Sequence, residues 1–314
     1  MYKYKYLILL LAIIVLNGCS PYRNVIKMEF DDVEYPYTVK KAELTNGIKL
    51  AYIDEGKGDN TIIFIHGLGS YLKAWNKNLP SLSEKYRCIA IDLPGYGKSS
   101  KEIHPGSMDF YAAVLADFIK KLDLKNVTLA GHSMGGQISM VFSLKYPQLV
   151  TNLVLVDPAG FEEFTEGQKQ WFRDVMTVPM VKNTPVQSIR ANLIMNFYDM
   201  PEDAEFMVTD RIAFRDAKDF DKYCYAVTRS VNGMVDQPVI NLLDRITKPT
   251  LIIFGENDNL IPNPYLTGGT TESIAKIGHE KITGSKLIMI PNCGHFAQFE
   301  KYQEVNNAIT DFLK

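Results

Sequence analysis

The hexapeptide GHSMGG, residues 131–136, decides the fold of this chain. The apolar run NVTLA, typical of a buried strand, precedes it, and the helix-like run QISMVFSLKYP follows it. A strand that leads directly into a helix needs a tight turn, and the residues beside its apex must be small. Gly131 and Gly135 meet that need. We therefore expect the turn to project Ser133 above the carboxyl edge of a sheet, at a helix N-terminus that favours negative charge.

Further short apolar runs have the length and composition of strands that are buried on both faces. Helical patterns separate these runs, for example over 107–122 with Ser107 as its N-cap. Asn46-Gly47 is a hairpin signal between two more strands, which predicts an antiparallel pair at the start of an eight-stranded, mostly parallel sheet. The runs predicted as strands after the hairpin are TIIFI (61–65), RCIAID (87–92), VTLA (127–130), LVLVD (153–157), TLIIFG (250–255) and KLIMI (286–290).

The stretch 161–244 interrupts this alternation, because it contains helix-like segments and no clear buried strand. Two of these segments are SIRANLIMNFYD (188–199) and AEFMVTDRIAFRDAKDF (204–220). We interpret 161–244 as a helical cap or lid, inserted into a core formed by 37–160 and 245–314. Its apolar side chains suit either a hydrophobic substrate or packing against the sheet; they include Trp171, Phe172, Met176, Phe197 and Met207.

A serine hydroxyl is a weak nucleophile and needs a general base. His295 is the best candidate, because it lies between the last predicted strand and the C-terminal helix, in a loop at the carboxyl end of the sheet. We expect His132, beside the serine, to pack near the site. His104 and His279 lie in polar stretches, so they are expected to face solvent.

The base in turn needs a carboxylate that orients it. Asp258, in FGENDNLIP after the strand at 250–254, gives the chain order serine, acid, histidine. Asp157, at the end of an earlier strand, is the rival candidate, and Glu256 is a weaker one.

The oxyanion of an acyl-transfer reaction needs two preorganised N–H donors. The backbone N–H of Met134, directly after the serine, should be one of them. The second should come from IHGLGS after the strand at 61–65, where Leu68 is the expected donor between Gly67 and Gly69, two residues that let the backbone approach closely.

The pieces IHGLG, IDLPGYGKS, LAGHSMGG, PTLIIFGENDNLIP and NCGHFAQFE follow one another as they do in the α/β-hydrolase family, which the chain resembles from about residue 40 to 314. The resemblance implies the α/β-hydrolase fold, a Ser133–Asp258–His295 triad and no cofactor. The fold itself leaves the reaction open. A serine nucleophile in place of an aspartate argues against haloalkane dehalogenase and epoxide hydrolase chemistry.

Two branches of that family are similar to this chain. The first is the lipase and carboxylesterase branch, which implies a small, hydrophobic ester as substrate. The second cleaves C–C bonds in meta-cleavage products of aromatic degradation, and CGHFAQFE is similar to its signature. Arg211 falls where that branch carries a substrate-binding arginine, with a solvated helix face as the alternative, whereas Phe296 and Phe299 stand where it usually carries tryptophan. A catalytically silent binding protein on the same fold is a third interpretation.

The first residues carry a different signal. Lys3 and Lys5 precede an apolar run, Leu7–Leu16, that is shorter than the roughly 20 residues that span a bilayer but suits a secretory signal. Leu16-Asn17-Gly18-Cys19 resembles the lipobox of bacterial lipoproteins, in which the cysteine becomes the lipid-bearing first residue. This implies a signal peptide over 1–18, lipidation of Cys19, a tether over 19–36 and a membrane-anchored protein of the bacterial cell envelope. An ordinary cleaved signal or an uncleaved anchor is the alternative.

The overall composition excludes some other functions. Lys plus Arg (34) nearly balance Asp plus Glu (36), so nothing indicates nucleic-acid binding. Beyond Cys19 the chain has Cys88, Cys224 and Cys293, an odd and widely spaced set that is not a disulfide framework. No metal-ligand spacing is present, so no metal is expected.

Overall fold

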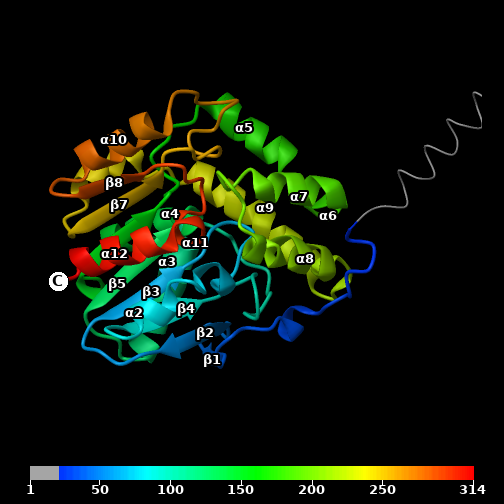
Figure 1. Ribbon diagram of the computed structural model, residues 1–314, viewed down its shortest axis with the longest axis horizontal. Coiled ribbons are helices and arrows are strands. Elements are labelled where there is room, and N and C mark those ends of the chain that lie inside the picture. The colour runs from blue at the N-terminus through cyan, green and yellow to red at the C-terminus, as the bar shows by residue number, and fades with distance from the viewer. Residues whose placement is uncertain (1–20) are drawn as a thin grey trace, which may run out of the picture.

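The computed structural model describes residues 21–314, so the predicted signal peptide over 1–18 and the predicted lipidation of Cys19 lie outside the described residues. Eight strands form one sheet in the order β1-β2-β4-β3-β5-β6-β7-β8 (Figure 1). β2 pairs antiparallel with both β1 and β4, and the other neighbours are parallel, which confirms the predicted antiparallel hairpin at the start of a mostly parallel sheet. The strands are β1 (Lys40–Glu43), β2 (Lys49–Glu55), β3 (Thr61–Ile65), β4 (Arg87–Ile91), β5 (Val127–His132), β6 (Asn152–Val156), β7 (Thr250–Gly255) and β8 (Lys286–Ile290).

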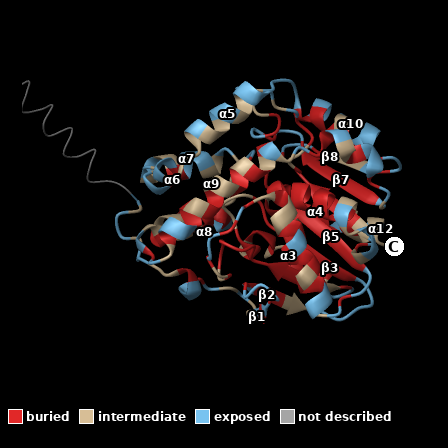
Figure 2. Ribbon diagram, turned by 180° about the vertical axis from the view of Figure 1, so that it is seen from behind, coloured by how far each residue is buried: buried red, intermediate tan, exposed pale blue. Residues whose placement is uncertain are grey.

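Helices cover both faces of the sheet and bury one apolar cluster on each. α3, α4 and α10 pack on one face, and α2, α11 and α12 on the other. Every residue of β3, β5 and β7 is buried between these layers (Figure 2), which explains their continuous apolar sequence. The six helices are α2 (Leu79–Leu82), α3 (Met108–Lys121), α4 (Met134–Lys145), α10 (Thr271–Lys281), α11 (Ala297–Glu300) and α12 (Tyr302–Phe312). The predicted cap of α3 is confirmed, since Ser107 Oγ accepts the Phe110 N–H at 3.1 Å.

Five α-helices lie between β6 and β7, and we call them the insertion. They are α5 (Glu166–Val175), α6 (Val178–Lys182), α7 (Val186–Ile194), α8 (Phe206–Ala213) and α9 (Phe220–Asp236). The helix-like segment 204–220 is divided in the structure, because α8 ends at Ala213 and α9 begins only at Phe220. Between them the Lys218 N–H donates to the Glu29 carboxylate at 3.2 Å, so a distant segment satisfies this backbone group. α9 is also bonded into the core, because Ser230 Oγ lies 2.8 Å from the hydroxyls of both Tyr96 and Tyr111.

The described part of the expected tether, residues 21–36, is packed against the insertion. Tyr22 donates a hydrogen bond to Glu205, and the Met28 N–H donates to the carbonyl of Ala213 at the end of α8. The ring of Phe30 is buried and stacks on Phe214 with 4.4 Å between centroids. This segment therefore has a fixed place on the molecule. No helix within residues 21–314 is both long enough and apolar enough to cross a membrane.

Candidate active site

Ser133 stands at the apex of a tight turn between β5 and α4. Its φ of 53° lies in the left-handed region, which is costly for a residue with a side chain. A Cβ at Gly131 would lie 2.2 Å from the Gly135 carbonyl oxygen, and a Cβ at Gly135 would lie 2.3 Å from the carbonyl oxygen of Ile65. Only glycine fits at these two positions, so the spacing of small residues around the serine is a consequence of backbone packing.

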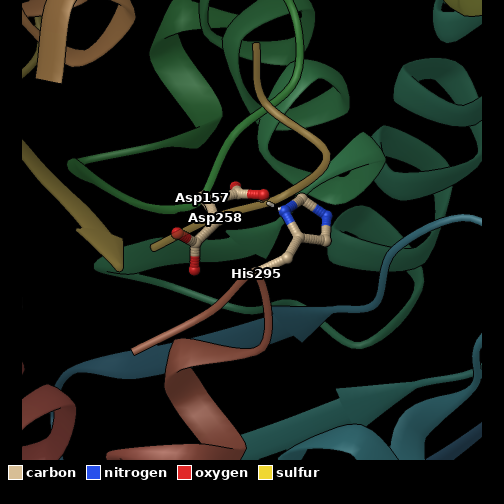
Figure 3. Close-up of side chains that lie close together, drawn as sticks. All are labelled: Asp157, Asp258 and His295. Carbon is tan, nitrogen blue, oxygen red and sulfur yellow. Dashed lines mark hydrogen bonds and ion pairs between the residues drawn. The ribbon is translucent and has the colours of Figure 1, made fainter. Parts of the chain in front are cut away.

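Asp258 and His295 form a buried pair (Figure 3). His295 Nδ1 lies 2.7 Å from Asp258 Oδ2. The other oxygen of Asp258 accepts the N–H groups of Leu260 at 2.7 Å and Ile261 at 3.1 Å, which fixes the carboxylate after β7. With Nδ1 held by Asp258, His295 Nε2 is the ring nitrogen that remains for proton transfer.

Ser133 and His295 line one cavity of about 280 Å³, which we call the catalytic cavity. Within residues 21–314, no hydrogen bond joins the Ser133 hydroxyl to His295; such contacts often tighten only in the complex with substrate. Most of the wall is apolar and comes from the insertion and the loops at the strand ends. The apolar lining includes Leu68, Phe164, Phe172, Met176, Val231, Met234, Val235, Leu260, Ile261 and Phe296.

Leu68 and Met134, the expected oxyanion donors, lie on the two turns that meet at Ser133. In the described part of the chain, neither backbone N–H donates to another protein group. The turn that carries Leu68 lies against the nucleophile, because a Cβ at Gly67 would be 3.1 Å from Ser133 Cβ. His66 holds this turn: its Nε2 accepts the Leu93 N–H at 3.0 Å, so its Nδ1–H donates to the Gly67 carbonyl at 2.8 Å.

Asp157, the rival acid, is buried close to the pair but bonds to backbone. Its Oδ1 accepts the Gly255 N–H at 2.8 Å and its Oδ2 accepts the Ala297 N–H at 3.3 Å. Burial, and then the charge of Asp258, raise the pKa of Asp157 well above its usual range. The structure therefore brings Asp258, and not Asp157, to the imidazole, while Glu256 is exposed.

One donor atom each from Asp157, Asp258 and His295 lies within 4.8 Å of the other two, which is also the spacing of a metal site (Figure 3). All four carboxylate oxygens already accept hydrogen bonds, one from His295 and the others from backbone N–H groups. These contacts explain the cluster without a cation.

The remaining histidines divide into buried and exposed ones. His132 Nε2 lies 2.8 Å from the His295 carbonyl oxygen, so His132 steadies the loop that carries the base. Burial lowers the pKa of His132 well below its usual range, which makes it a neutral donor. The expected solvent exposure of His104 is wrong: it is 7% exposed, and its Nδ1 accepts the Gly106 N–H at 3.1 Å. His279 is exposed, as expected.

A second cavity, of about 510 Å³, adjoins the catalytic cavity. The two share Leu68, Met176, Asn196 and Phe296 as lining residues. Arg211, on α8, lines the second cavity and is half-buried, so it does not lie on a solvated helix face. Its guanidinium contacts the Tyr223 hydroxyl and lies 3.4 Å from the Gly69 carbonyl oxygen, beside the turn that carries Leu68.

The apolar residues singled out in the insertion take both expected roles. Phe172 and Met176 line the catalytic cavity, and Met207 lines the second cavity. Phe197 is buried and stacks on Phe296 at 5.4 Å, which is packing. Trp171 lines neither cavity.

One lining residue had no signal in the sequence. Glu162 is buried, and it accepts the Asn263 N–H at 2.8 Å and the Thr267 hydroxyl at 2.6 Å. It thereby holds the loop that follows Asp258. A single acid after the β6 turn gives no sequence pattern from which this role could be predicted.

A family model described as alpha/beta hydrolase fold matches residues 60–302, most of the chain. The chain belongs to the α/β-hydrolase family. Among curated relatives, a 2-hydroxy-6-oxononadienedioate/2-hydroxy-6-oxononatrienedioate hydrolase of Pseudomonas putida is 27% identical over 276 residues, 85% of this chain and 92% of that protein. Among solved structures, a probable hydrolytic enzyme from Pseudomonas aeruginosa has a TM-score of 0.80 at 25% identity, covering 92% of this chain and 99% of the other. An esterase from Exiguobacterium antarcticum has a TM-score of 0.74 at 23% identity, covering 88% and 99%, and shows the shared fold.

Proposed function

We propose that this α/β hydrolase is a membrane-anchored serine esterase, with Ser133 as nucleophile, His295 as general base and Asp258 as the acid that orients it. One observation carries the proposal: a buried imidazole, fixed by a carboxylate at 2.7 Å, shares a cavity with a serine on a strained turn. Activation of a hydroxyl by a base that a third group orients is the arrangement that acyl transfer requires.

In the first half of the reaction, the Ser133 hydroxyl attacks the ester carbonyl while His295 Nε2 takes its proton. Asp258 stabilises the imidazolium through Nδ1–H. The N–H groups of Met134 and Leu68 bind the oxyanion, and the N-terminus of α4 adds a favourable dipole. His295 then returns the proton to the alkoxide of the leaving group, and the acyl group stays on Ser133.

In the second half, a water molecule takes the place of the alcohol. His295 removes a proton from it, the resulting hydroxide attacks the acyl carbon, and a second tetrahedral oxyanion forms in the same site. Collapse of this intermediate releases the carboxylic acid and returns the proton to Ser133. Side chains and backbone of this chain perform each step, so the proposal needs no cofactor.

The apolar lining of the catalytic cavity supports a hydrophobic acyl or alcohol group, and the insertion would act as the lid that excludes water from it. The sequence Leu16-Asn17-Gly18-Cys19 supports the proposed anchor. Lipid on Cys19 would hold the enzyme at a membrane of the bacterial cell envelope.

A second candidate is hydrolysis of a C–C bond in a meta-cleavage product. Two observations favour it: the 27% identical relative from Pseudomonas putida, and the position of Arg211 on the adjoining cavity, where a cation could bind an acidic substrate group. Assays of p-nitrophenyl esters of short and long chain, beside a vinylogous diketone, distinguish the two reactions. Turnover of the diketone at a kcat/KM above that for every ester would favour C–C hydrolysis.

The direct test of the nucleophile is Ser133→Ala. Loss of the hydroxyl should lower kcat/KM for p-nitrophenyl butyrate by about 10⁴-fold or more, because the variant has no nucleophile at this position. A fluorophosphonate probe should label the wild type and leave the variant unlabelled. Thermal unfolding should stay within about 2 °C of the wild type, since only one oxygen atom is removed.

Full ester hydrolysis by Ser133→Ala would dismiss Ser133. A wild-type protein that the probe does not label, and that turns over neither ester nor diketone, would instead favour the third interpretation, a silent binding protein on this fold.

A further inference from the structure

We propose that the outer face of the insertion and the loop after β7 lie against the bilayer that holds the anchor, so that a bilayer-resident ester enters the cavities directly. This inference rests on the proposed anchored esterase and narrows its substrates to lipids. The surface in question is a set of exposed apolar side chains that we call the apolar rim: Trp171, Met180, Met195, Tyr198, Leu260 and Tyr265.

Members of the apolar rim lie at or beside the cavities. Met180 is 61% exposed and also lines the second cavity, and Leu260 is 36% exposed and lines the catalytic cavity. Met195 lies beside the loop that carries Asp258, because its carbonyl accepts from Asn259 Nδ2 at 3.3 Å. Trp171 is 40% exposed, and its ring lies 5.3 Å from that of Phe172, a wall of the catalytic cavity. Two members of the apolar rim thus line the cavities themselves, so an apolar group at this surface lies at the entrance to the site.

Exposed apolar side chains are concentrated here. Within residues 21–314, eight large apolar side chains are exposed, and six of them belong to the apolar rim. The other two are Ile26, in the segment packed along α8, and Ile103, in the loop after β4. A gathering of methionine, tryptophan, tyrosine and leucine around a cavity mouth marks an interaction surface, and tryptophan and tyrosine suit the boundary between headgroups and acyl chains.

The start of the described chain identifies the occupant as a bilayer. Tyr22 is hydrogen-bonded to Glu205 beside α8, and residues 22 to 30 pack along the surface of the insertion. Cys19 is only three residues before Tyr22 in the sequence, and three residues span at most about 10 Å when fully extended. α8 itself lines the second cavity through Met207 and Arg211. A lipid on Cys19 would thus hold the membrane at the insertion, and a packed segment would keep it there.

The two adjoining cavities indicate which esters the site can hold. The catalytic cavity and the second cavity meet at Leu68, which is also the expected oxyanion donor. An ester drawn from the bilayer could place its carbonyl at Ser133 and extend one apolar chain into each cavity. The substrates that this geometry favours are esters with long acyl chains, held in a membrane.

The chain offers a direct probe of the contact, because it has two tryptophans and only one lies on the surface. Trp75 is fully buried beneath β3, and Trp171 belongs to the apolar rim. The full-length lipidated protein would be reconstituted into vesicles of phosphatidylethanolamine and phosphatidylglycerol, with and without phosphatidylcholine brominated on its acyl chains. The emission of Trp171, taken as wild type minus Trp171→Phe, should fall at least about twofold with brominated lipid, as expected for a ring at the acyl boundary. The Trp171→Phe protein should show no quenching.

Activity gives a second readout. The double variant Trp171→Gln and Met195→Gln should hydrolyse a long-chain ester in vesicles about tenfold more slowly, because it loses apolar contact with the bilayer. It should retain its rate on soluble p-nitrophenyl butyrate, since neither side chain lines a cavity. Ile103→Gln is the matched control, an exposed apolar side chain outside the apolar rim, and should leave both rates unchanged.

The outcomes separate this inference from the proposed function. A protein that floats with vesicles and hydrolyses the soluble ester, but whose Trp171 is not quenched, overturns the bilayer contact and leaves the anchored esterase intact. Protection of Trp171 from aqueous iodide without quenching by brominated lipid also overturns it, and indicates a second copy of the chain as occupant. A purified full-length protein whose mass shows no lipid on Cys19 removes the anchor, and this inference with it.

Discussion

α4 and α5 are helices of similar length with opposite surroundings. Ten of the 12 residues of α4 are buried, whereas none of the 10 residues of α5 is buried. Gly135, in α4, has backbone oxygen 2.3 Å from the position of a Cβ, while Gly167, in α5, has no atom within 4 Å of that position. The core thus fixes the nucleophile through close backbone contact. The insertion contributes cavity walls made of side chains, and these positions have space for substitution.

The largest expected effect is a difference in kcat/KM between variants of the two buried carboxylates, Asp258 and Asp157. Asp258→Asn should lower kcat/KM for p-nitrophenyl butyrate by about 10³-fold or more, because an amide neither orients the imidazole nor stabilises its charged form. Asp157→Asn should cost less than about tenfold, since Asp157 bonds to the backbone N–H groups of Gly255 and Ala297 and not to the imidazole. Steady-state kinetics of both variants checks this. Equal losses would make Asp157 a partner of the base.

A matched pair of glycine variants tests the difference in packing between core and insertion. Gly135→Ala should lower the free energy of unfolding by about 3 kcal/mol or more, because the new Cβ overlaps the carbonyl oxygen of Ile65. Gly167→Ala should raise it by up to about 0.5 kcal/mol, because alanine favours the helix and meets no neighbour. Urea unfolding measures both. A mild effect at Gly135 would contradict the close packing of the turn.

The free energy of unfolding should depend on pH through His104, which lies where the core meets the insertion. Burial lowers the pKa of His104 to about 4, against about 6.5 in the unfolded chain. Between these two values the unfolded state binds a proton that the folded state does not, so stability falls as the pH falls from 6.5 towards 4. From pH 7 to pH 5 the loss is about 2 kcal/mol.

The His104→Asn variant isolates this contribution, because its side-chain oxygen can replace Nδ1 as acceptor for Gly106. Urea unfolding at pH 7 and pH 5 should show that the variant is less sensitive to pH than the wild type by about that amount. His279→Asn, at an exposed position, should behave as the wild type does. An unchanged pH dependence in His104→Asn would mean that the pKa of His104 does not differ between the folded and unfolded states.

The smallest effect should come from the wall of the catalytic cavity. Phe172→Ala should raise KM for long-chain esters about tenfold with little change in kcat, because a wall residue contributes binding that is equal in the ground state and the transition state. Kinetics with butyrate and laurate esters measure it. A fall in kcat on both esters would assign Phe172 a role at the reacting atoms.

The sequence predicted the parts of the site that backbone geometry constrains. Gly131 and Gly135 must be glycine, so the turn at Ser133 leaves a pattern that can be read along the chain. Asp258 follows the buried strand β7 and His295 follows the half-exposed edge strand β8, and parallel strands bring their carboxyl ends to one edge. The sheet was predictable for the same reason, since its central strands are buried on both faces and have continuous apolar sequences.

What could not be predicted depends on contacts between distant segments. The break between α8 and α9 is stabilised by Glu29, nearly two hundred residues away in the sequence. His104 lies in a polar stretch, yet its loop is buried against α9, where a Cβ at Gly95 would lie 2.4 Å from Ala226 and 2.9 Å from His104 Nε2. The position of Arg211 on the second cavity likewise follows from the packing of α8, which no local pattern specifies.

Ser230 has a consequence for how such an enzyme could diversify. Its hydroxyl joins Tyr96 and Tyr111 of the core to α9, and α5 and α6 pack against α9. Replacement of α5 and α6 with other helices would leave this junction in place. A protein engineer who wants a new specificity should graft between Thr165 and Asn183 and keep α9 as it is.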